Sequence, residues 1–388
     1  MKFSIFHPFP TYGAPASTWP VPSKHSRIKN LSSRGLHDSL EFARRADEGG
    51  IDMVSVAEHH YSSKQLTPNS ILAATLVAGV VEKANVGLLG TTLPLVNPVR
   101  IAEEIGMLDI VAKGKLLIGF FRGTPNEFLT YGTNPWESRE VFLEQLELMR
   151  ACWREPEPFA WTGRHFDYRT VSVWPQPIQT EIPTLITANS PQSATHAARN
   201  GYIGGFSFFG PDTVAPLSKL FVEQGREAGR KVTPEDMLYR CFALVADTDQ
   251  QAEDIFARTR FGDMIQLNKD IGASSPVTAR VGAAMAGVPA SVQLTGKPKG
   301  GPSFPDRPLF IGSPDTVAKQ IKDFVAATGV GRIEVTLSES NLPQEHSNRS
   351  LDLYTREVLP QVRGLDPVQL TAESGTGTYL KEPNAVAI

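Results

Sequence analysis

The chain has 388 residues, of which 41% are hydrophobic, and its 38 basic and 41 acidic side chains give a formal net charge of −3. This balance argues against nucleic acid or an anionic membrane surface as a partner, and the sequence shows neither the roughly 18-residue apolar run of a membrane span nor a signal peptide. Its two cysteines, Cys152 and Cys241, lie far apart in apolar segments, which is typical of a reduced cytoplasmic protein with buried thiols.

The first part of the chain predicts short strands that alternate with longer helices. A strand at 2–6 is followed by a Pro-, Ser- and Thr-rich loop to about Ser33, and a loop of this length is usually functional or a lid. The pair Gly49-Gly50 ends the first helix. The other expected elements are helices at 36–48, 67–82, 97–113 and 137–153 and strands at 51–56, 85–89 and 115–121.

The second part of the chain continues this alternation around two insertions. Residues 155–183 combine several prolines with alternating aromatic and aliphatic side chains, which predicts a surface hairpin. Residues 263–306 lose all periodicity and gain small residues, which predicts a second insertion. The remaining expected elements are strands at 184–187, 202–207, 238–246 and 332–337 and helices at 191–200, 213–228, 251–260, 313–327 and 348–362.

Eight such units close most naturally into a (β/α)₈ barrel of the TIM type, with insertions after the fourth and seventh strands. A doubly wound sheet is the alternative. We expect one barrel domain over 1–365 and a polar tail at 366–388 that is either disordered or laid over a neighbouring subunit. Active sites of such barrels lie at the carboxyl ends of the strands, so the residues directly after each strand are the candidates.

The stretch 54–61, VSVAEHHY, places Glu58, His59 and His60 at the end of the second strand. An imidazole titrates near neutrality and can accept or donate a proton, so a histidine here suits acid–base catalysis. Adjacent side chains on extended backbone point to opposite sides, so only one of the two histidines can face the pocket. Two structural histidines are the alternative, whereas the lack of a nearby Cys or Asp argues against a metal site.

The segment after the fifth strand, ITANSPQSATHAARNG at 186–201, predicts an anion site. Ser190 is placed as the N-cap of a helix and Pro191 as its first residue. This helix would point free backbone N–H groups into the barrel mouth, with the hydroxyl of Ser193 one turn away. Arg122, after the fourth strand, could add a bidentate contact to a phosphate. An ordinary capped helix with a solvated arginine is the alternative.

Several blocks in order carry a resemblance to a known family, although no G-x-G-x-x-G, Walker or H-E-x-x-H motif is present. They are MKFSIF at 1–6, AEHHY at 57–61, the run from 85 to 123 and ITANSPQSATHAARNG, with a return around IGSPDTVAKQI and YTREVLP. On these blocks, which cover most of residues 1–260, the chain resembles the bacterial luciferase-like, flavin-dependent monooxygenases. The fold of that family is a (β/α)₈ barrel, in agreement with the count of strands and helices.

The resemblance implies a reduced FMN in the barrel mouth. Its phosphate would lie on the residues after the fourth and fifth strands, and its ring beside Leu89-Gly90, where the family often has a non-proline cis peptide. His59 matches the acid–base residue of the family, and Glu58 and His60 would position it. The residues that would hold FMN are Leu89, Gly90, Phe121, Arg122, Thr124, Thr187, Ala188, Asn189, Ser190 and Ser193.

The implied activity is that of a two-component monooxygenase. Reduced FMN from a separate flavin reductase would react with O₂ to a C4a-(hydro)peroxide and insert one oxygen atom into an aldehyde, ketone or hydrophobic natural product. Hydride transfer with the deazaflavin F420 and a non-catalytic flavin-binding subunit are the alternatives, and a homodimer or a heterodimer with a related chain is expected. The aromatic loop residues that suggest an apolar substrate are Trp136, Trp161, Phe166, Trp174, Phe206, Phe208 and Phe209.

The chain also departs from the family at three positions. Phe121 stands where the catalytic chain of luciferase has a reactive cysteine, which argues against light emission. Thr124-Pro125 replaces a Leu-Tyr pair that contacts the flavin. Asn189 replaces an acidic residue at the start of the phosphate helix, and a neutral amide would repel a phosphate less.

Overall fold

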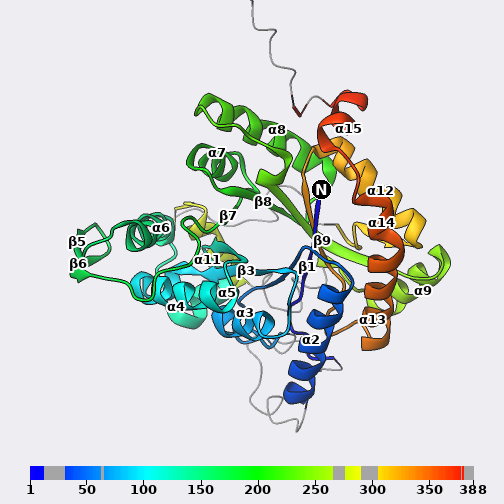
Figure 1. Ribbon diagram of the computed structural model, residues 1–388, viewed down its shortest axis with the longest axis horizontal. Coiled ribbons are helices and arrows are strands. Elements are labelled where there is room, and N and C mark those ends of the chain that lie inside the picture. The colour runs from blue at the N-terminus through cyan, green and yellow to red at the C-terminus, as the bar shows by residue number, and fades with distance from the viewer. Residues whose placement is uncertain (13–30, 63–64, 265–275, 290–304, 377, 380–388) are drawn as a thin grey trace, which may run out of the picture.

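The computed structural model describes residues 1–12, 31–62, 65–264, 276–289, 305–376 and 378–379, and its parallel strands close into a barrel (Figure 1). β8 pairs with β9 and β11 pairs with β1, so the ring has no open edge. The expected (β/α)₈ barrel is therefore confirmed, and the doubly wound sheet is wrong. The barrel strands in order are β1 (Lys2–Phe6), β2 (Met53–Val56), β3 (Asn85–Thr92), β4 (Leu116–Phe121), β7 (Thr184–Thr187), β8 (Ile203–Ser207), β9 (Met237–Val245) and β11 (Arg332–Thr336).

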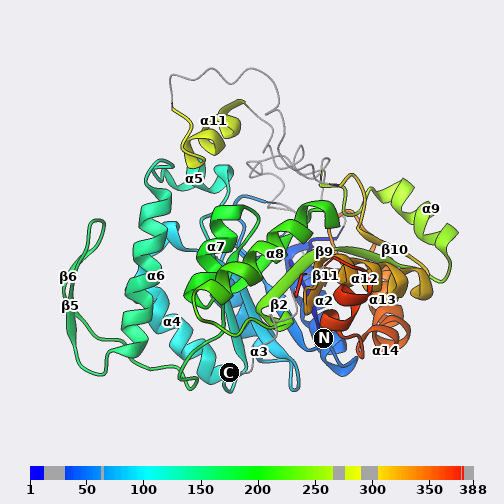
Figure 2. The same cartoon turned by 90° about the horizontal axis from the view of Figure 1, so that it is seen from above.

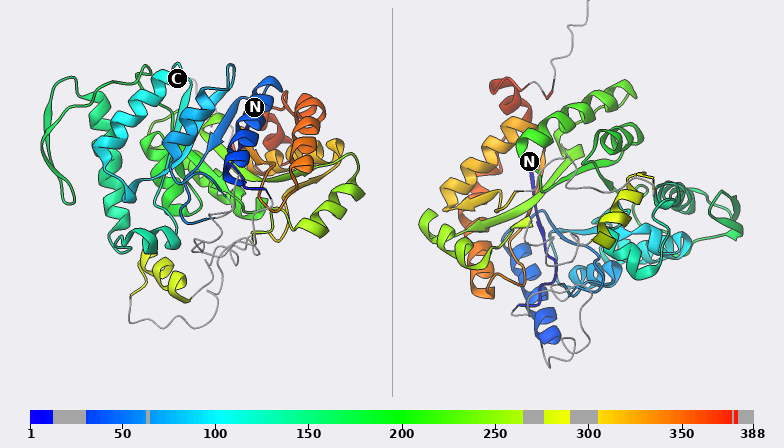
Figure 3. Two further views of the ribbon diagram at one scale, coloured as in Figure 1. Left: turned by 90° about the horizontal axis from the view of Figure 1, so that it is seen from below. Right: turned by 180° about the vertical axis from the view of Figure 1, so that it is seen from behind.

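Helices surround this barrel on the outside (Figures 1 and 3). Asn69 and Asn97 cap the starts of α3 and α4, because their side chains accept hydrogen bonds from backbone N–H groups of the first turn. Within the described ranges, no helix is long and apolar enough to cross a membrane. The outer helices are α2 (Leu31–Glu48), α3 (Ser70–Ala78), α4 (Pro98–Val111), α6 (Ser138–Arg154), α7 (Pro191–Asn200), α8 (Pro211–Glu227), α9 (Asp249–Thr259), α12 (Pro314–Thr328), α13 (Gln344–Leu353) and α14 (Leu359–Val362), with short turns η1 (Leu93–Leu95), η2 (Pro234–Asp236) and the π-helical η3 (Tyr354–Val358).

The strands are apolar on both faces, as buried parallel strands are. Their outward side chains, such as Ile5, Val54 and Ile118, pack under the helices in the main core. Their inward side chains form a separate cluster that fills the barrel, so the barrel interior is a packed core. This inner cluster contains Met53, Leu89, Leu117, Leu185, Ile203 and Leu238.

A charged pair lies above this inner cluster, toward the carboxyl ends of the strands. Arg240 on β9 pairs with Glu334 on β11, and the two side chains are only 10% and 0% exposed. The second oxygen of Glu334 accepts a hydrogen bond from the Ser55 hydroxyl on β2, at 2.5 Å. Arg240 Nη2 also donates to the Leu89 carbonyl on β3, at 3.2 Å, and its guanidinium lies over the ring of Phe6. This network joins strands from opposite sides of the barrel.

The first insertion is the expected hairpin. β5 (Phe159–Thr162) and β6 (Asp167–Val171) pair in antiparallel fashion and project beside α6 (Figure 2). Glu144 on α6 holds the turn of this hairpin, because its carboxylate accepts hydrogen bonds from Trp161 Nε1 and from the backbone N–H groups of 164–166. The hairpin lies away from the barrel mouth.

The second insertion is more regular than expected. Residues 276–285 form a helix, α11 (Pro276–Met285), which packs on a short helix that the sequence also did not predict, α5 (Pro125–Tyr131) (Figures 2 and 3). A further strand, β10 (Phe310–Gly312), pairs with the end of β9 outside the ring. The rest of the expected insertion, at 265–275 and 290–304, and most of the expected first loop, at 13–30, lie outside the described residues.

The stretch after Asp366 is not only a polar tail. Its first residues form helix α15 (Pro367–Glu373), which packs on α12 of the same chain. Tyr379 then donates its hydroxyl to the Gly329 carbonyl at 2.7 Å. The start signal was readable, because the Asp366 side chain caps the helix and Pro367 follows as its first residue. Residues 380–388 lie outside the described part.

Candidate active site

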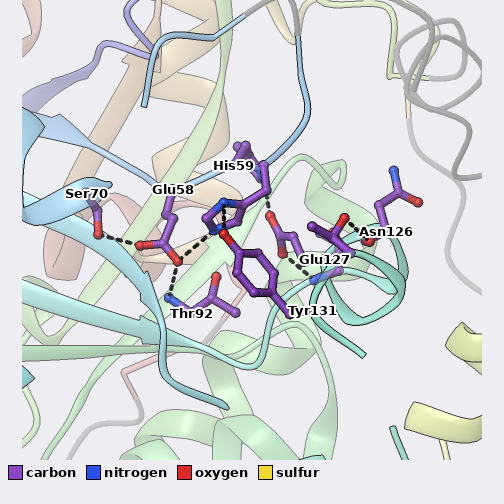
Figure 4. A network of polar contacts seen from close by, with 10 residues as sticks. Glu58, His59, Ser70, Thr92, Asn126, Glu127 and Tyr131 are labelled. Carbon is purple, nitrogen blue, oxygen red and sulfur yellow. Dashed lines mark hydrogen bonds and ion pairs between the residues drawn. The ribbon is translucent and has the colours of Figure 1, made fainter. Parts of the chain in front are cut away.

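The two adjacent histidines after β2 point in different directions, as extended backbone requires. The side chain of His59 is 40% exposed, whereas that of His60 is 8% exposed. His59 Nδ1 lies 3.0 Å from Glu127 Oε1, and His60 Nε2 lies 3.3 Å from Glu58 Oε1 (Figure 4). The histidines therefore enter separate networks, and His59 is the one open to a substrate.

Glu127, the partner of His59, was missed by the sequence analysis. It lies in the first turn of α5, where its Oε2 accepts a hydrogen bond from the Thr124 backbone N–H at 2.7 Å, so that its Oε1 is turned to His59. Thr124 and Glu127 form a capping box, with Pro125 as the first helical residue. The signal for this arrangement, T-P-N-E, is present in the sequence.

The pair of His59 and Glu127 favours the charged form of both groups. Burial by itself lowers the pKa of His59, but the hydrogen bond and the negative charge of Glu127 outweigh it, so the pKa lies above its usual value. Burial by itself raises the pKa of Glu127, but the hydrogen bond and charge of His59 lower it overall. An imidazolium held beside a carboxylate and partly open to solvent can act as a general acid.

Contrary to the expectation from the sequence, Glu58 does not position His59 directly. Its carboxylate accepts hydrogen bonds from the Ser70 hydroxyl at 3.0 Å and the Thr92 backbone N–H at 3.4 Å, besides its contact with His60. The reason is the alternation of side chains, because Glu58 and His60 lie on one side of the chain and His59 on the other. Glu58 acts on His59 only through its charge, which helps to raise that pKa.

The end of β3 has the backbone form that the resemblance implies, since the peptide between Leu89 and Gly90 is cis. Only glycine fits at position 90, because an added Cβ would lie 2.1 Å from the Gly119 carbonyl oxygen of β4. Phe121, at the end of β4, is partly exposed and packs against the inner cluster. The glycine is therefore required by the close approach of β3 and β4.

The start of α7 offers donors for an anion. Ser190 caps the helix, and the hydroxyls of Ser190 and Ser193 lie 2.8 Å apart. Arg139, in the first turn of α6, donates to Gln192 in the first turn of α7 at 2.9 Å. Burial, and then the charge of Arg139, lower the pKa of Arg122. A helix N-terminus with a cation beside it fits a phosphate.

Arg139 was also missed by the sequence analysis. Its signal is weak but physical, because the first turn of a helix favours acidic residues and an arginine there opposes the helix dipole. Arg122 also has a partner on α11, because its Nη1 donates a hydrogen bond to the Met285 carbonyl at the end of that helix, at 3.0 Å.

Three further expected contact residues lie at the end of β7 or directly after it. Asn189 accepts a hydrogen bond from the backbone N–H of Ser207 with its Oδ1, so its side chain contacts the end of β8. The Ala188 backbone N–H donates to the Gly205 carbonyl of β8, and Thr187 is the last residue of β7.

Three of the aromatic residues that suggested an apolar pocket do not face the barrel mouth. Trp161 and Phe166 belong to the hairpin, and Phe206 is buried against Phe221 of α8. At the strand ends, the ring of Phe208 stacks on Phe242 with centroids 5.3 Å apart. Phe242 follows Arg240 by two positions on β9, so it shares the inward face of that strand. The apolar wall is therefore smaller than expected.

A family model described as luciferase-like monooxygenase matches residues 1–332. The alkanal monooxygenase alpha chain of Photorhabdus luminescens is 32% identical over 164 residues, or 42% of this chain and 45% of that protein. The corresponding chain of Aliivibrio fischeri is 26% identical over 208 residues, or 53% of this chain and 58% of that protein. The chain thus spans about half the length of these curated relatives.

Solved structures share the fold over nearly the whole chain. Monooxygenase RslO1 from Streptomyces bottropensis has a TM-score of 0.73 and 24% identity, and covers 93% of this chain and 99% of its own. A second similar structure is the oxygenating constituent of 3,6-diketocamphane monooxygenase from Pseudomonas putida, a type II Baeyer–Villiger monooxygenase in complex with FMN. It has a TM-score of 0.70 and 21% identity, and covers 93% of this chain and 99% of its own. An F420-dependent secondary alcohol dehydrogenase has a TM-score of 0.67 and 17% identity, with the same coverage of both chains.

Replacing Glu127 by Gln is expected to lower the pKa of His59, because the amide keeps the size of the side chain and removes the charge that favours the protonated ring. Titration of the His59 ring followed by NMR measures this. Glu104→Gln, on the outer face of α4, is the matched control and should leave the titration unchanged. Equal titration curves for both variants would show that Glu127 does not control His59.

The same pair should make stability depend on pH. The raised pKa of His59 contributes stability that is complete below 6.5, its ordinary value, and is lost as pH rises through the folded pKa. The lowered pKa of Glu127 contributes stability that is complete above 4.5 and is lost as pH falls. Urea denaturation should therefore show the largest difference in free energy of unfolding between wild type and Glu127→Gln from pH 4.5 to 6.5.

Proposed function

We propose, from the premise that the chain belongs to the luciferase-like monooxygenase family, that it is a reduced-FMN-dependent monooxygenase acting on an apolar organic substrate. The observation that carries the proposal is the ion pair of His59 and Glu127, with His59 partly open at the same barrel mouth as the anion donors. A non-catalytic flavin-binding subunit would have no use for a histidine whose protonated form is stabilised by a carboxylate.

The described residues fit FMN. Arg122, Arg139 and the start of α7 with Ser190 and Ser193 would hold its phosphate, and the donor set is that of a doubly charged anion. The ring would lie beside the Leu89–Gly90 peptide. When bound, reduced FMN would supply the two electrons with which one atom of O₂ enters the substrate and the other leaves as water. Because the chain has no nicotinamide motif, a separate reductase would deliver the reduced flavin.

The contribution of the chain itself is to hold a proton and to orient the substrate. His59 carries the proton on its ring, and Glu127 keeps the ring charged and fixes its direction. Phe208 and Phe242 provide an apolar wall at the ends of β8 and β9, across the barrel from β2 and β3. An aldehyde, ketone or hydrophobic natural product fits this combination of an acid group and aromatic rings.

Isotope labelling tests the proposal. The protein, a flavin reductase, NADH, FMN and ¹⁸O₂ are incubated with a panel of apolar aldehydes, ketones and terpenoids, and products are analysed by mass spectrometry. We expect a product with one ¹⁸O atom, and none when the reductase is left out. In a parallel incubation, F420H₂ replaces the reductase, NADH and FMN, and reduction of a carbonyl without ¹⁸O there would indicate hydride transfer instead. Flavin binding without any product would indicate a binding subunit.

Arg122→Ala should weaken FMN by roughly 10- to 100-fold, the value of a charge-assisted hydrogen bond, and leave riboflavin nearly unchanged because riboflavin lacks the phosphate. Calorimetry with both flavins measures the difference. Arg139→Ala should behave alike, and Arg100→Ala, on the exposed face of α4, is the control. Equal weakening of both flavins would place Arg122 away from the phosphate.

His59→Ala should lower turnover by roughly 10²- to 10⁴-fold, the usual contribution of a general acid or base. Its FMN affinity should stay near wild type, whereas its melting temperature should fall, because Glu127, 3% exposed, would lose its charged partner. His60→Ala should lower the melting temperature as well, since that ring is buried. His165→Ala, in the hairpin turn, is the control. Unchanged turnover per folded molecule in His59→Ala would contradict the assignment.

A further inference from the structure

Helix α5 contacts both neighbouring histidines. Glu127, in its first turn, lies 3.0 Å from His59 Nδ1, and the hydroxyl of Tyr131, its last residue, lies 2.9 Å from His60 Nδ1. Residues four positions apart lie on one face of a helix, so one face of α5 is turned toward 59–60. Glu127 and Tyr131 are labelled in Figure 4, where dashed lines mark these contacts. The helix thus grips two adjacent residues at two points.

The contact of Tyr131 with His60 combines a hydrogen bond with ring packing. The Tyr131 hydroxyl can donate to or accept from His60 Nδ1, according to the tautomer and charge of the ring. Burial and the negative charge of Glu58 raise the pKa of Tyr131, so its hydroxyl keeps its proton. The two rings also meet edge to face, with centroids 4.7 Å apart.

His60, which Tyr131 contacts, is itself held in place by its neighbours. Its Nε2 contacts Glu58, whose carboxylate is held by the Ser70 hydroxyl of α3 and the Thr92 backbone N–H of β3. Ser70 is in turn 2.9 Å from the Thr91 hydroxyl. Tyr131 is therefore connected to the barrel wall through His60 and Glu58.

Besides its packing against α11, α5 is held in position by few contacts. A helix of seven residues is far shorter than an isolated helix that is stable in water. Phe128 is its buried apolar anchor, at 1% exposure, whereas Leu129 and Tyr131 are 37% and 52% exposed. The capping box holds the start of the helix, and Tyr131 holds its end.

We propose that Tyr131 is a positioning residue for the acid–base group: by binding His60 it fixes the end of α5, and so keeps Glu127 in contact with His59. The inference rests on the proposed function, and it adds to that function a residue that touches neither cofactor nor substrate. The proposal also gives His60 a role, because its ring links Tyr131 of α5 to Glu58 at the barrel wall.

Tyr131→Phe tests the proposal, because it removes the hydroxyl and leaves the ring against His60. NMR titration of the unliganded protein should show the pKa of His59 moving toward its usual value, by less than in Glu127→Gln. The other charges that act on His59, Glu58 after β2 and Arg240 on β9, stay in place. Turnover with reduced FMN should fall about 2- to 10-fold, the value of one hydrogen bond. The melting temperature should change by no more than about 2–4 °C.

Tyr61→Phe is the matched control, because Tyr61 is an equally exposed tyrosine next to His60, at 55% exposure. It should leave the titration of His59 and the turnover at wild-type values. Identical His59 titrations in both variants would overturn the proposal, and so would a loss of stability in Tyr131→Phe without any change in titration. A wild-type protein that transfers no ¹⁸O would instead reject the proposed function. The titration needs no cofactor, so it would still test the role of Tyr131.

Discussion

A charged pair inside the barrel fixes the strands on which the candidate site is built. A buried charge without a partner is costly, so Arg240 and Glu334 hold β9 and β11 in a single register. The hydrogen bonds from Ser55 to Glu334 and from Arg240 to the Leu89 carbonyl extend this constraint to β2 and β3. These are the strands whose ends carry the histidines and the cis peptide. The floor of the mouth therefore rests on a polar network above the apolar inner cluster.

The chemistry above this floor is divided between the barrel and a short additional helix. β2 presents His59, but the carboxylate that keeps it charged comes from α5, which lies between β4 and α6 and has no place in the simple alternation of strands and helices. α5 also packs against α11, and the Met285 carbonyl at the end of α11 accepts a hydrogen bond from Arg122. The acid group and the anion donors are thus linked through one small element.

The sequence predicted the regular part of this architecture and missed the short elements. Strands and long helices have hydrophobic periodicity over enough residues to be recognised. α5, α15 and β10 have seven, seven and three residues, too few for a periodic pattern to stand out, although α5 and α15 begin with readable caps. α11 has ten residues, but many of them are small and show no hydrophobic periodicity. The resemblance to the family led to the cis peptide and to His59, but not to Arg139 or Glu127.

The sequence by itself determined the order of the barrel strands, the place of the EHH block at a strand end and the capped start of α7, because these follow from local periodicity and capping. Only the tertiary structure decided the partner of each polar side chain. The ion pair of His59 and Glu127 joins residues 68 positions apart, and that of Arg240 and Glu334 joins residues 94 positions apart. Such contacts are set by ring closure, which brings the ends of distant strands to one mouth, and no local pattern encodes which of several nearby carboxylates will face a given histidine.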